Sequence, residues 1–182
     1  IAGESLTFLQ AEGLSNSAVL NRIMSGNPTQ FDGTLSGVDM RIFMVNPAGI
    51  IFGLGSQVNV SQLVASGLNM SDTDFLNATD GSPADFRFEG GNGIVQNSGE
   101  IQANSVYLIG KQISNIGGAI IAPGGLIVLA VGDNVYLAQD GSNVLVQVEG
   151  PSAYPYDIDN RTLISTRDGG KIVLAAGDTF SR

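Results

Sequence analysis

Few side chains in this sequence suit catalysis, because it contains no histidine and no cysteine. The usual proton shuttle, the commonest metal ligand and every thiolate or disulfide are therefore missing. Two acidic groups remain, one in the stretch Asn-Ala-Thr-Asp-Gly at 77–81 and one formed by Asp157 and Asp159 beside Arg161. Paired carboxylates can hydrolyse a glycosidic bond, and a basic residue with acidic Ca²⁺ ligands can support elimination from a polysaccharide.

Both acidic groups lie in irregular, proline-flanked sequence, so we expect solvated acids and interpret the chain as not an enzyme. The stretch at 77–81 is only loosely similar to an Asn-Thr-Asp-Gly hydrolase motif. The segment from Glu89 also departs from the calcium repeat Gly-Gly-x-Gly-x-Asp, because Val95 occupies the aspartate position. We expect no catalytic, cofactor or metal site. A polysaccharide lyase or hydrolase stays as an alternative, which a degradation assay would test.

Composition and charge limit the partners of this chain. Among its 182 residues, 43% are hydrophobic, 14% are charged and 25 are glycine, as expected for short apolar strands joined by tight turns. The formal net charge is −9 and no basic cluster occurs, which argues against nucleic-acid binding. No apolar run approaches the roughly 18 residues of a membrane helix, so we expect no membrane insertion.

The candidate site is a turn that must be held between two strands. Two apolar runs flank the tetrapeptide Asn46-Pro47-Ala48-Gly49. Proline presets φ at the second turn position, glycine accepts a positive φ, and the asparagine side chain can bond the backbone two residues on. This chemistry predicts strand, turn, strand, and a generic β-turn is the simplest interpretation of these residues alone. The alternating run at 58–60 predicts a further strand with one buried face.

Internal repeats begin near residue 93. Residues 124–133 and 169–178 are identical at eight of ten positions, at an offset of 45 residues. A weaker strand pair at 135–137 and 144–148 lies between them, so we interpret the 45 residues as two structural repeats of about 22. Upstream, residues 99–103 match 118–122 at an offset of 19, and residues 106–110 match 128–132 at an offset of 22.

A period near 20 residues, with short strands and Gly/Asn corners, is typical of a parallel β-solenoid. Each coil has an apolar face that it cannot bury alone, and stacking coils about 4.8 Å apart buries these faces while pairing the backbones. Asn97 and Asn115 lie at corresponding corners and are predicted to stack as an asparagine ladder. A β-sandwich is the alternative fold, but it would not explain why the ten-residue segment returns.

Two segments interrupt the repeats. We expect residues 69–91 and 149–161 to be extrahelical insertions in a single domain of residues 1–182. The first is predicted to hold a short helix near 72–76 or a hairpin ending at 86–88. The second carries Tyr154 and Tyr156 in a proline-rich loop, where a carbohydrate or protein contact is an alternative to surface packing. Because Ile1 begins inside structured sequence, we interpret the chain as a fragment of a longer exoprotein.

Several motifs occur in a characteristic order: Phe8-Leu-Gln10, Asn16-Ser-Ala-Val-Leu-Asn21-Arg22, Gly33-x-Leu35, Phe43-Met-Val-Asn46-Pro47-Ala48-Gly49-Ile50 and Phe52-Gly53. Together with the later repeats, this order resembles the TPS or haemagglutination-activity domain. That domain is the N-terminal secretion domain of filamentous-haemagglutinin-like and high-molecular-weight adhesins of Gram-negative bacteria. The family turn usually reads Asn-Pro-Asn-Gly-Ile, so Ala48 departs from the pattern.

The resemblance implies an all-β, right-handed parallel β-helix with extrahelical hairpins or loops, and a role in two-partner secretion. It implies that the periplasmic POTRA domains of an outer-membrane transporter recognise the chain, which then folds outside the cell. The mature protein would be a secreted or surface-bound adhesin with roles in cell adhesion and virulence. A host-cell receptor or glycan would bind downstream regions.

The same resemblance assigns the candidate site, with the secretion motif at Asn46, Pro47, Ala48, Gly49 and Ile50 and supporting positions at Asn21 and Arg22. Whether this turn contacts the transporter or only folds the first coil stays open. The alternative function is a carbohydrate- or host-binding adhesive β-solenoid.

Overall fold

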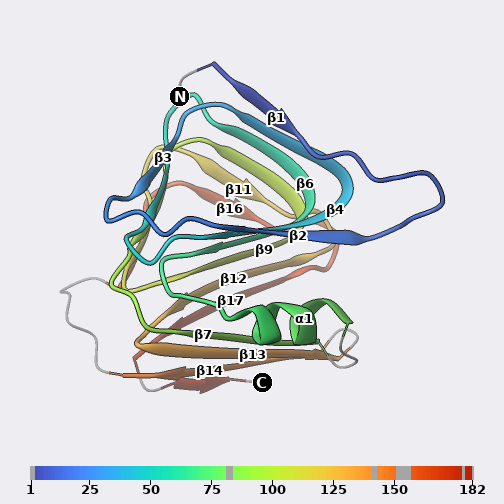
Figure 1. Ribbon diagram of the computed structural model, residues 1–182. Helices are drawn as coiled ribbons and strands as arrows, with labels where there is room; N and C mark the ends of the chain where they lie inside the picture. The colour runs from blue at the N-terminus through green and yellow to red at the C-terminus, as the bar shows by residue number, and fades with distance from the viewer. Residues whose placement is uncertain (1–2, 81–83, 141–142, 151–156, 178, 182) are drawn as a thin grey trace.

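The computed structural model describes residues 3–80, 84–140, 143–150, 157–177 and 179–181. Most of these residues lie in β-strands, and the one helix among them is α1 (Asp72–Asp80). Figure 1 shows strands stacked in layers, with α1, β7, β13 and β14 gathered below the stack in this view. The prediction of an all-β fold is confirmed.

Two of the sheets contain only parallel strand pairs. Within the described ranges, the larger sheet has nine strands: β1 (Ser5–Thr7), β2 (Ser17–Arg22), β4 (Thr34–Val45), β6 (Gln57–Ser66), β9 (Glu100–Gly110), β11 (Ala119–Ile121), β12 (Leu126–Val131), β16 (Leu163–Ser165) and β17 (Lys171–Ala176). The smaller one has five described strands: β3 (Thr29–Phe31), β5 (Ile50–Phe52), β8 (Val95–Asn97), β10 (Ile113–Asn115) and β15 (Ile158–Asn160).

Successive coils place equivalent residues opposite one another. Each coil adds one strand to the smaller sheet and then one or two strands to the larger sheet. In the smaller sheet Ile50 pairs with Val95, Val95 with Ile113, and Ile113 with Ile158. Apolar side chains therefore form columns inside the stack, as coil stacking requires. The parallel arrangement is consistent with a β-helix.

Two apolar cores lie on opposite faces of the larger sheet. Along β9, Val106 and Leu108 face the core inside the coils, whereas Tyr107 and Ile109 face a second core on the outside. An antiparallel sheet covers this second core, and its four described strands are β7 (Ala84–Glu89), β13 (Asn134–Asp140), β14 (Asn143–Glu149) and β18 (Thr179–Ser181). The Phe86 ring stacks on Tyr107 across the interface, with ring centroids 5.3 Å apart.

The 45-residue offset marks one coil and not two. β12 pairs directly with β17, with Leu126 opposite Lys171. The strands between them, β13 and β14, pair antiparallel in the outer sheet, so the interpretation as two repeats of 22 residues is wrong. A strand's composition shows that it is a strand but does not reveal which sheet it joins.

The strand register agrees with one of the two shorter predicted offsets and not with the other. The offset of 19 is confirmed, since Ile101 pairs with Ile120. The offset of 22 is wrong by one residue, because Val128 pairs with Tyr107 and not with Val106. A shift of one residue exchanges the two faces of a strand, so Val128 contributes to the outer core and not to the interior of the coils.

The two interrupting segments contribute strands to different sheets. The predicted helix near 72–76 is confirmed and extends to Asp80, and β7 follows it. β7 pairs with β13, with Phe86 opposite Leu137. In the second segment, β15 belongs to the smaller parallel sheet, and Tyr154 and Tyr156 lie outside the described residues. The domain and insertion boundaries stay predictions.

Candidate functional site

The predicted turn joins β4 to β5. The Gly49 amide donates a hydrogen bond to the Asn46 carbonyl oxygen at 2.8 Å, which closes a β-turn. The Ala48 amide donates to Asn46 Oδ1 at 2.9 Å, so the asparagine side chain bonds the backbone two residues on, as predicted. Gly49 has φ +120°, a conformation that side chains disfavour. The predicted strand, turn, strand arrangement is confirmed.

The Asn46 side chain also bonds the segment that leads into β3 and the first residue of that strand. Its Nδ2 donates to the Asn27 carbonyl oxygen at 3.0 Å and to Thr29 Oγ1 at 2.9 Å, with Ser25 Oγ at 3.4 Å. The side chain is 0% exposed. A buried amide with both its donor and its acceptor used is part of the fold's framework, because leaving such groups unpaired destabilises the folded state. Nothing in the types of residues 25–29 predicts these contacts.

Gly49 lies between adjacent coils. Its carbonyl accepts from the Thr29 amide at 2.9 Å, while the next amide, of Ile50, donates to the Ile94 carbonyl at 2.9 Å. A Cβ on Gly49 would lie 2.9 Å from that same Ile94 oxygen. Glycine is therefore required both by the backbone angle and by the space between coils.

The remaining turn residues differ in exposure. Ile50 is fully buried in the interior core, whereas Pro47 and Ala48 are partly exposed. The Pro47 carbonyl accepts from the Asn92 amide at 3.1 Å, which joins the turn to the chain returning from the first interrupting segment. In the folded domain, Pro47 and Ala48 are thus the members of the motif that a partner can reach.

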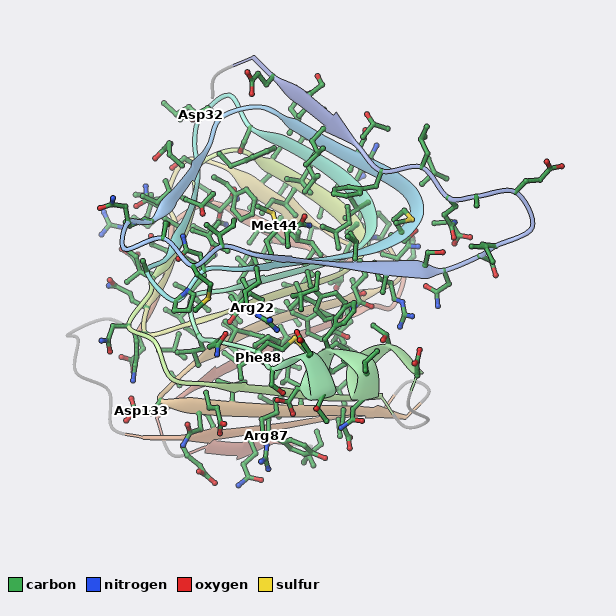
Figure 2. All side chains as sticks on the ribbon, viewed as in Figure 1. Arg22, Asp32, Met44, Arg87, Phe88 and Asp133 are labelled. Atoms are coloured by element: carbon green, nitrogen blue, oxygen red, sulfur yellow. The ribbon has the colours of Figure 1, made fainter. Side chains whose placement is uncertain are left out.

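Arg22 fastens β2 to the helix. β2 pairs with β4 so that Arg22 lies opposite Val45, directly before the turn. Arg22 Nη1 forms an ion pair with Asp72 Oδ1 at 2.7 Å, and Nη2 donates to the Met70 carbonyl at 2.6 Å. Figure 2 shows Arg22 between the stack and α1. The structure therefore places both family-motif segments side by side, with half-buried Asn21 paired to Met44.

An asparagine ladder runs along one corner. Asn97 Nδ2 donates to Asn115 Oδ1 at 2.9 Å, which confirms the predicted stacking. Asn115 Nδ2 donates in turn to Asn160 Oδ1 at 2.7 Å. The sequence interpretation missed Asn160, although it lies 45 residues after Asn115, at the same offset as the strongest repeat.

The acidic groups occupy separate elements. Asp80 ends α1, whereas Asp159 lies in β15. Arg161 Nη2 bonds Asp159 Oδ2 at 2.7 Å, and this contact holds the pKa of the Asp159 carboxyl below its usual value. Among the described residues no group of three or more acidic side chains is placed to hold a metal ion.

Comparison with known proteins adds to these observations. The family model described as the TPS secretion domain matches residues 1–178. The chain is also similar to the heme/hemopexin-binding protein of Haemophilus influenzae, with 26% identity over 159 residues. This match covers 85% of the chain but only 17% of the relative. In the part of the chain that the structure describes, no helix has the length and apolar character needed to cross a bilayer.

The family match bears directly on the order of motifs in the sequence. It covers the turn at Asn46, the strand that ends at Arg22 and the corner ladder, and it confirms the resemblance on which the candidate site was chosen. The chain therefore belongs to the TPS secretion domain family and is the secretion domain of an exoprotein exported by two-partner secretion.

Proposed function

We propose that this domain delivers a large bacterial surface adhesin or exoprotein to its cognate outer-membrane transporter, whose POTRA domains bind it in the periplasm. The observation that carries the proposal is the family match over residues 1–178. The chain is bound before it folds and leaves the cell as an extended polypeptide. Attachment to the cell surface and contacts with a host receptor belong to the rest of the exoprotein.

Outside the cell, the chain folds as a right-handed parallel β-helix. The strand register supports the parallel stacking of the coils, because each coil pairs only with its neighbours. Folding can then advance one coil at a time, because each new coil needs only the edge left by the previous one. Every coil that folds outside opposes backward movement, which favours net export without ATP.

The motif Asn46, Pro47, Ala48, Gly49 and Ile50 has two roles in this proposal. In the unfolded chain it is recognised by the transporter, and in the folded chain it locks the first coils together. Burial of Asn46 supports this order, because a side chain that is 0% exposed is inaccessible to a partner of the folded domain. Asn21 and Arg22 support the folded state, through β2 and the contacts to α1.

The proposed binding mode is strand addition. An unfolded segment rich in β-formers can extend a sheet of a POTRA domain, with backbone hydrogen bonds giving affinity and alternate side chains giving specificity. Continuous apolar runs flank Asn46 at the end of β4 and along β5, and their Ile, Val and Phe residues are strong β-formers.

The test uses the chain kept unfolded in denaturant and then diluted onto the POTRA domains of the transporter encoded beside it. We expect wild-type binding to be lost in the double variant Asn46→Ala/Gly49→Val. The matched control is Asn59→Ala/Gly26→Val, which alters an exposed asparagine and an uncrowded glycine. Equal binding by both variants would refute the role of the motif, and absence of wild-type binding would refute the proposed partner.

Neither catalysis nor heme binding is part of this proposal. The name of the H. influenzae relative records binding of heme and hemopexin, but the match covers 17% of that protein. This chain has no histidine and no cysteine, two of the side chains that commonly ligate heme iron. We propose that the domain has no enzymatic activity, and its incubation with pectin-like polymers should release no product.

A further inference from the structure

The outer face of the antiparallel sheet carries an ordered set of polar side chains. Its inner face is buried against the second core, whereas alternate residues of β7, β13 and β14 face outward. Figure 2 shows this difference for Phe88, on the inner side, and Arg87, on the outer side. The strand register arranges the outward residues in two neighbouring rows, Glu89-Asn134-Glu149 and Arg87-Tyr136-Gln147.

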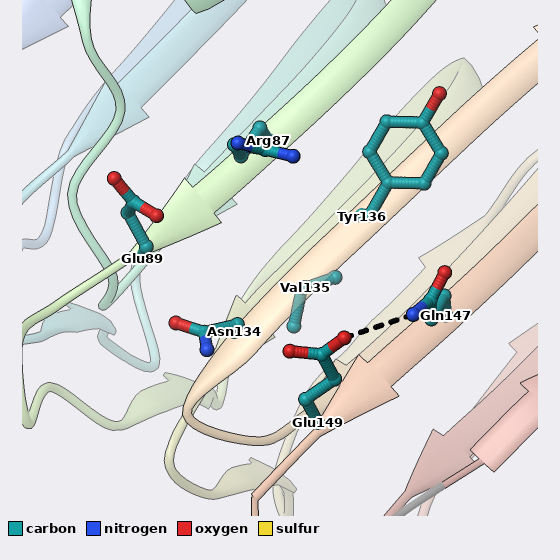
Figure 3. A pocket seen from close by; sticks show the side chains of 7 residues that line it. All are labelled: Arg87, Glu89, Asn134, Val135, Tyr136, Gln147 and Glu149. Carbon is teal, nitrogen blue, oxygen red and sulfur yellow. Dashed lines mark hydrogen bonds between the residues drawn. The ribbon is translucent and has the colours of Figure 1, made fainter.

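These two rows line a groove of about 380 Å³. Such a volume is at the small end of ligand sites, which suits a short oligosaccharide better than a large cofactor. Figure 3 shows Tyr136, Arg87 and Gln147 among the side chains that line the groove. The lining of the groove therefore contains an aromatic ring flanked by groups that donate and accept hydrogen bonds.

Hydrogen bonds hold the side chains of this groove in place. Tyr136 Oη donates to Asp85 Oδ1 at 3.0 Å, and Gln147 Nε2 donates to Glu149 Oε1 at 2.9 Å. Partial burial and the contact with Asp85 raise the pKa of the Tyr136 phenol, so it stays protonated and continues to donate. A ring held at its hydroxyl presents a face whose orientation needs little further ordering on binding.

The charges and the position of the groove disfavour most ligand classes. Asp85, Glu89 and Glu149 outnumber the one cation, Arg87, among the described side chains of this face, so an anionic glycan or nucleic acid would be repelled. A peptide strand would add to a sheet edge, not to a face. Of the described lining residues only Val135 is apolar, and it is 1% exposed. An apolar ligand would therefore find little apolar surface to contact.

We infer that the outer face of the antiparallel sheet, centred on Tyr136, binds a neutral glycan. The apolar C–H face of a sugar ring packs on an aromatic ring, and its hydroxyls both donate and accept. Arg87, Asn134 and Gln147 supply donors, while Glu89 and Glu149 supply acceptors. This activity belongs to the folded domain and is independent of the proposed recognition of the unfolded chain.

The test begins with the folded 182-residue chain on an array of neutral and anionic oligosaccharides, followed by calorimetry with the best neutral ligand. Because the chain has no tryptophan, tyrosine fluorescence gives a second readout. We expect Tyr136→Ala to weaken binding about tenfold and Tyr136→Phe, which keeps the ring, to weaken it less. Gln102→Ala, on an exposed position of β9, is the matched control and should leave affinity unchanged.

Three results would overturn the inference: no saturable binding of any neutral glycan, preference for anionic glycans, or undiminished binding by Tyr136→Ala. Circular dichroism and the urea midpoint of each variant show whether it is folded. If Tyr136→Ala is unfolded, Tyr136→Phe and Gln147→Ala replace it, and unchanged affinity in both would count equally against the site.

Discussion

Replacing Asn46 by alanine tests whether the buried turn holds the first coils together. The change removes the acceptor of the Ala48 amide and the donor to the Asn27 carbonyl and the Thr29 hydroxyl. Each hydrogen bond contributes about 1 kcal/mol net, and a buried group left unpaired costs about 1 to 3 kcal/mol. The Thr29 hydroxyl can rotate, and water can reach the partly exposed Ala48. We therefore expect a loss of about 2 to 3 kcal/mol in the free energy of unfolding.

Urea unfolding followed by far-ultraviolet circular dichroism measures this loss. With a slope of about 2 to 3 kcal/mol per molar urea, the midpoint should fall by about 1 M. The control Asn59→Ala, at an exposed position of β6, should change stability by less than about 0.5 kcal/mol. Asn46→Asp keeps the acceptor for the Ala48 amide but loses the donors to Asn27 and Thr29. Its urea midpoint should therefore also be lower than that of the wild type. An Asn46→Ala midpoint equal to that of the control would refute the argument.

Three further predictions concern other contacts of the fold. Gly49→Ala should lower the free energy of unfolding by about 2 to 4 kcal/mol, because it combines a positive φ with a Cβ too close to the next coil. Gly26→Ala, where the added Cβ meets open space, should have little effect in the same urea assay. Asn115→Ala should lower stability by about 2 to 3 kcal/mol in thermal or urea unfolding, because it breaks two bonds of a buried ladder. Arg22→Met should cost about 1 to 3 kcal/mol through the lost bond to a backbone carbonyl, and more than Asp72→Asn, whose 82% exposed carboxylate is screened. Adding 0.5 M NaCl should leave the loss of stability in Arg22→Met largely unchanged, because salt screens the ion pair and not the bond to the backbone carbonyl. A loss of stability that salt abolishes would contradict the role of that carbonyl bond.

Sequence periodicity predicted the parallel coils because stacked coils repeat the same apolar positions. Ile101 and Ile120 pair as their flanking residues indicated. Periodicity failed for β13 and β14, since alternating apolar residues suit an antiparallel hairpin as well as a coil. It also failed by one residue at Val128, because a short corner insertion cannot be placed from similarity alone. Sequence similarity identifies equivalent strands, but the number of coils between them depends on where the intervening chain goes.

The turn itself was predictable because its chemistry is local. Proline, glycine and the asparagine side chain act within four residues of one another. The contacts from Asn46 to Asn27 and from Arg22 to Met70 use backbone carbonyls, which every residue type supplies. The groove around Tyr136 was missed for another reason. Its side chains come from two segments that the sequence treats separately and that meet only in the antiparallel sheet.

Burial of Asn46 makes binding to the transporter and closure of the first coil mutually exclusive in the proposed mechanism. A side chain whose amide is enclosed by Asn27 and Thr29 must leave any partner before the coil can close. Loss of stability and loss of recognition should therefore separate in variants that destabilise the fold elsewhere. Asn115→Ala weakens the folded ladder but leaves the motif intact in the unfolded chain.

We expect unfolded Asn115→Ala to bind the POTRA domains as tightly as wild type and unfolded Asn46→Ala to bind more weakly, although both lose similar stability. Measuring both affinities in the same residual denaturant makes the comparison direct. Weakened binding by both variants would mean that the transporter selects a partly folded chain. In that case Asn46 would affect binding only by stabilising the fold. A residue with that role alone should change the affinity for the POTRA domains in the same way as Asn115 of the ladder does.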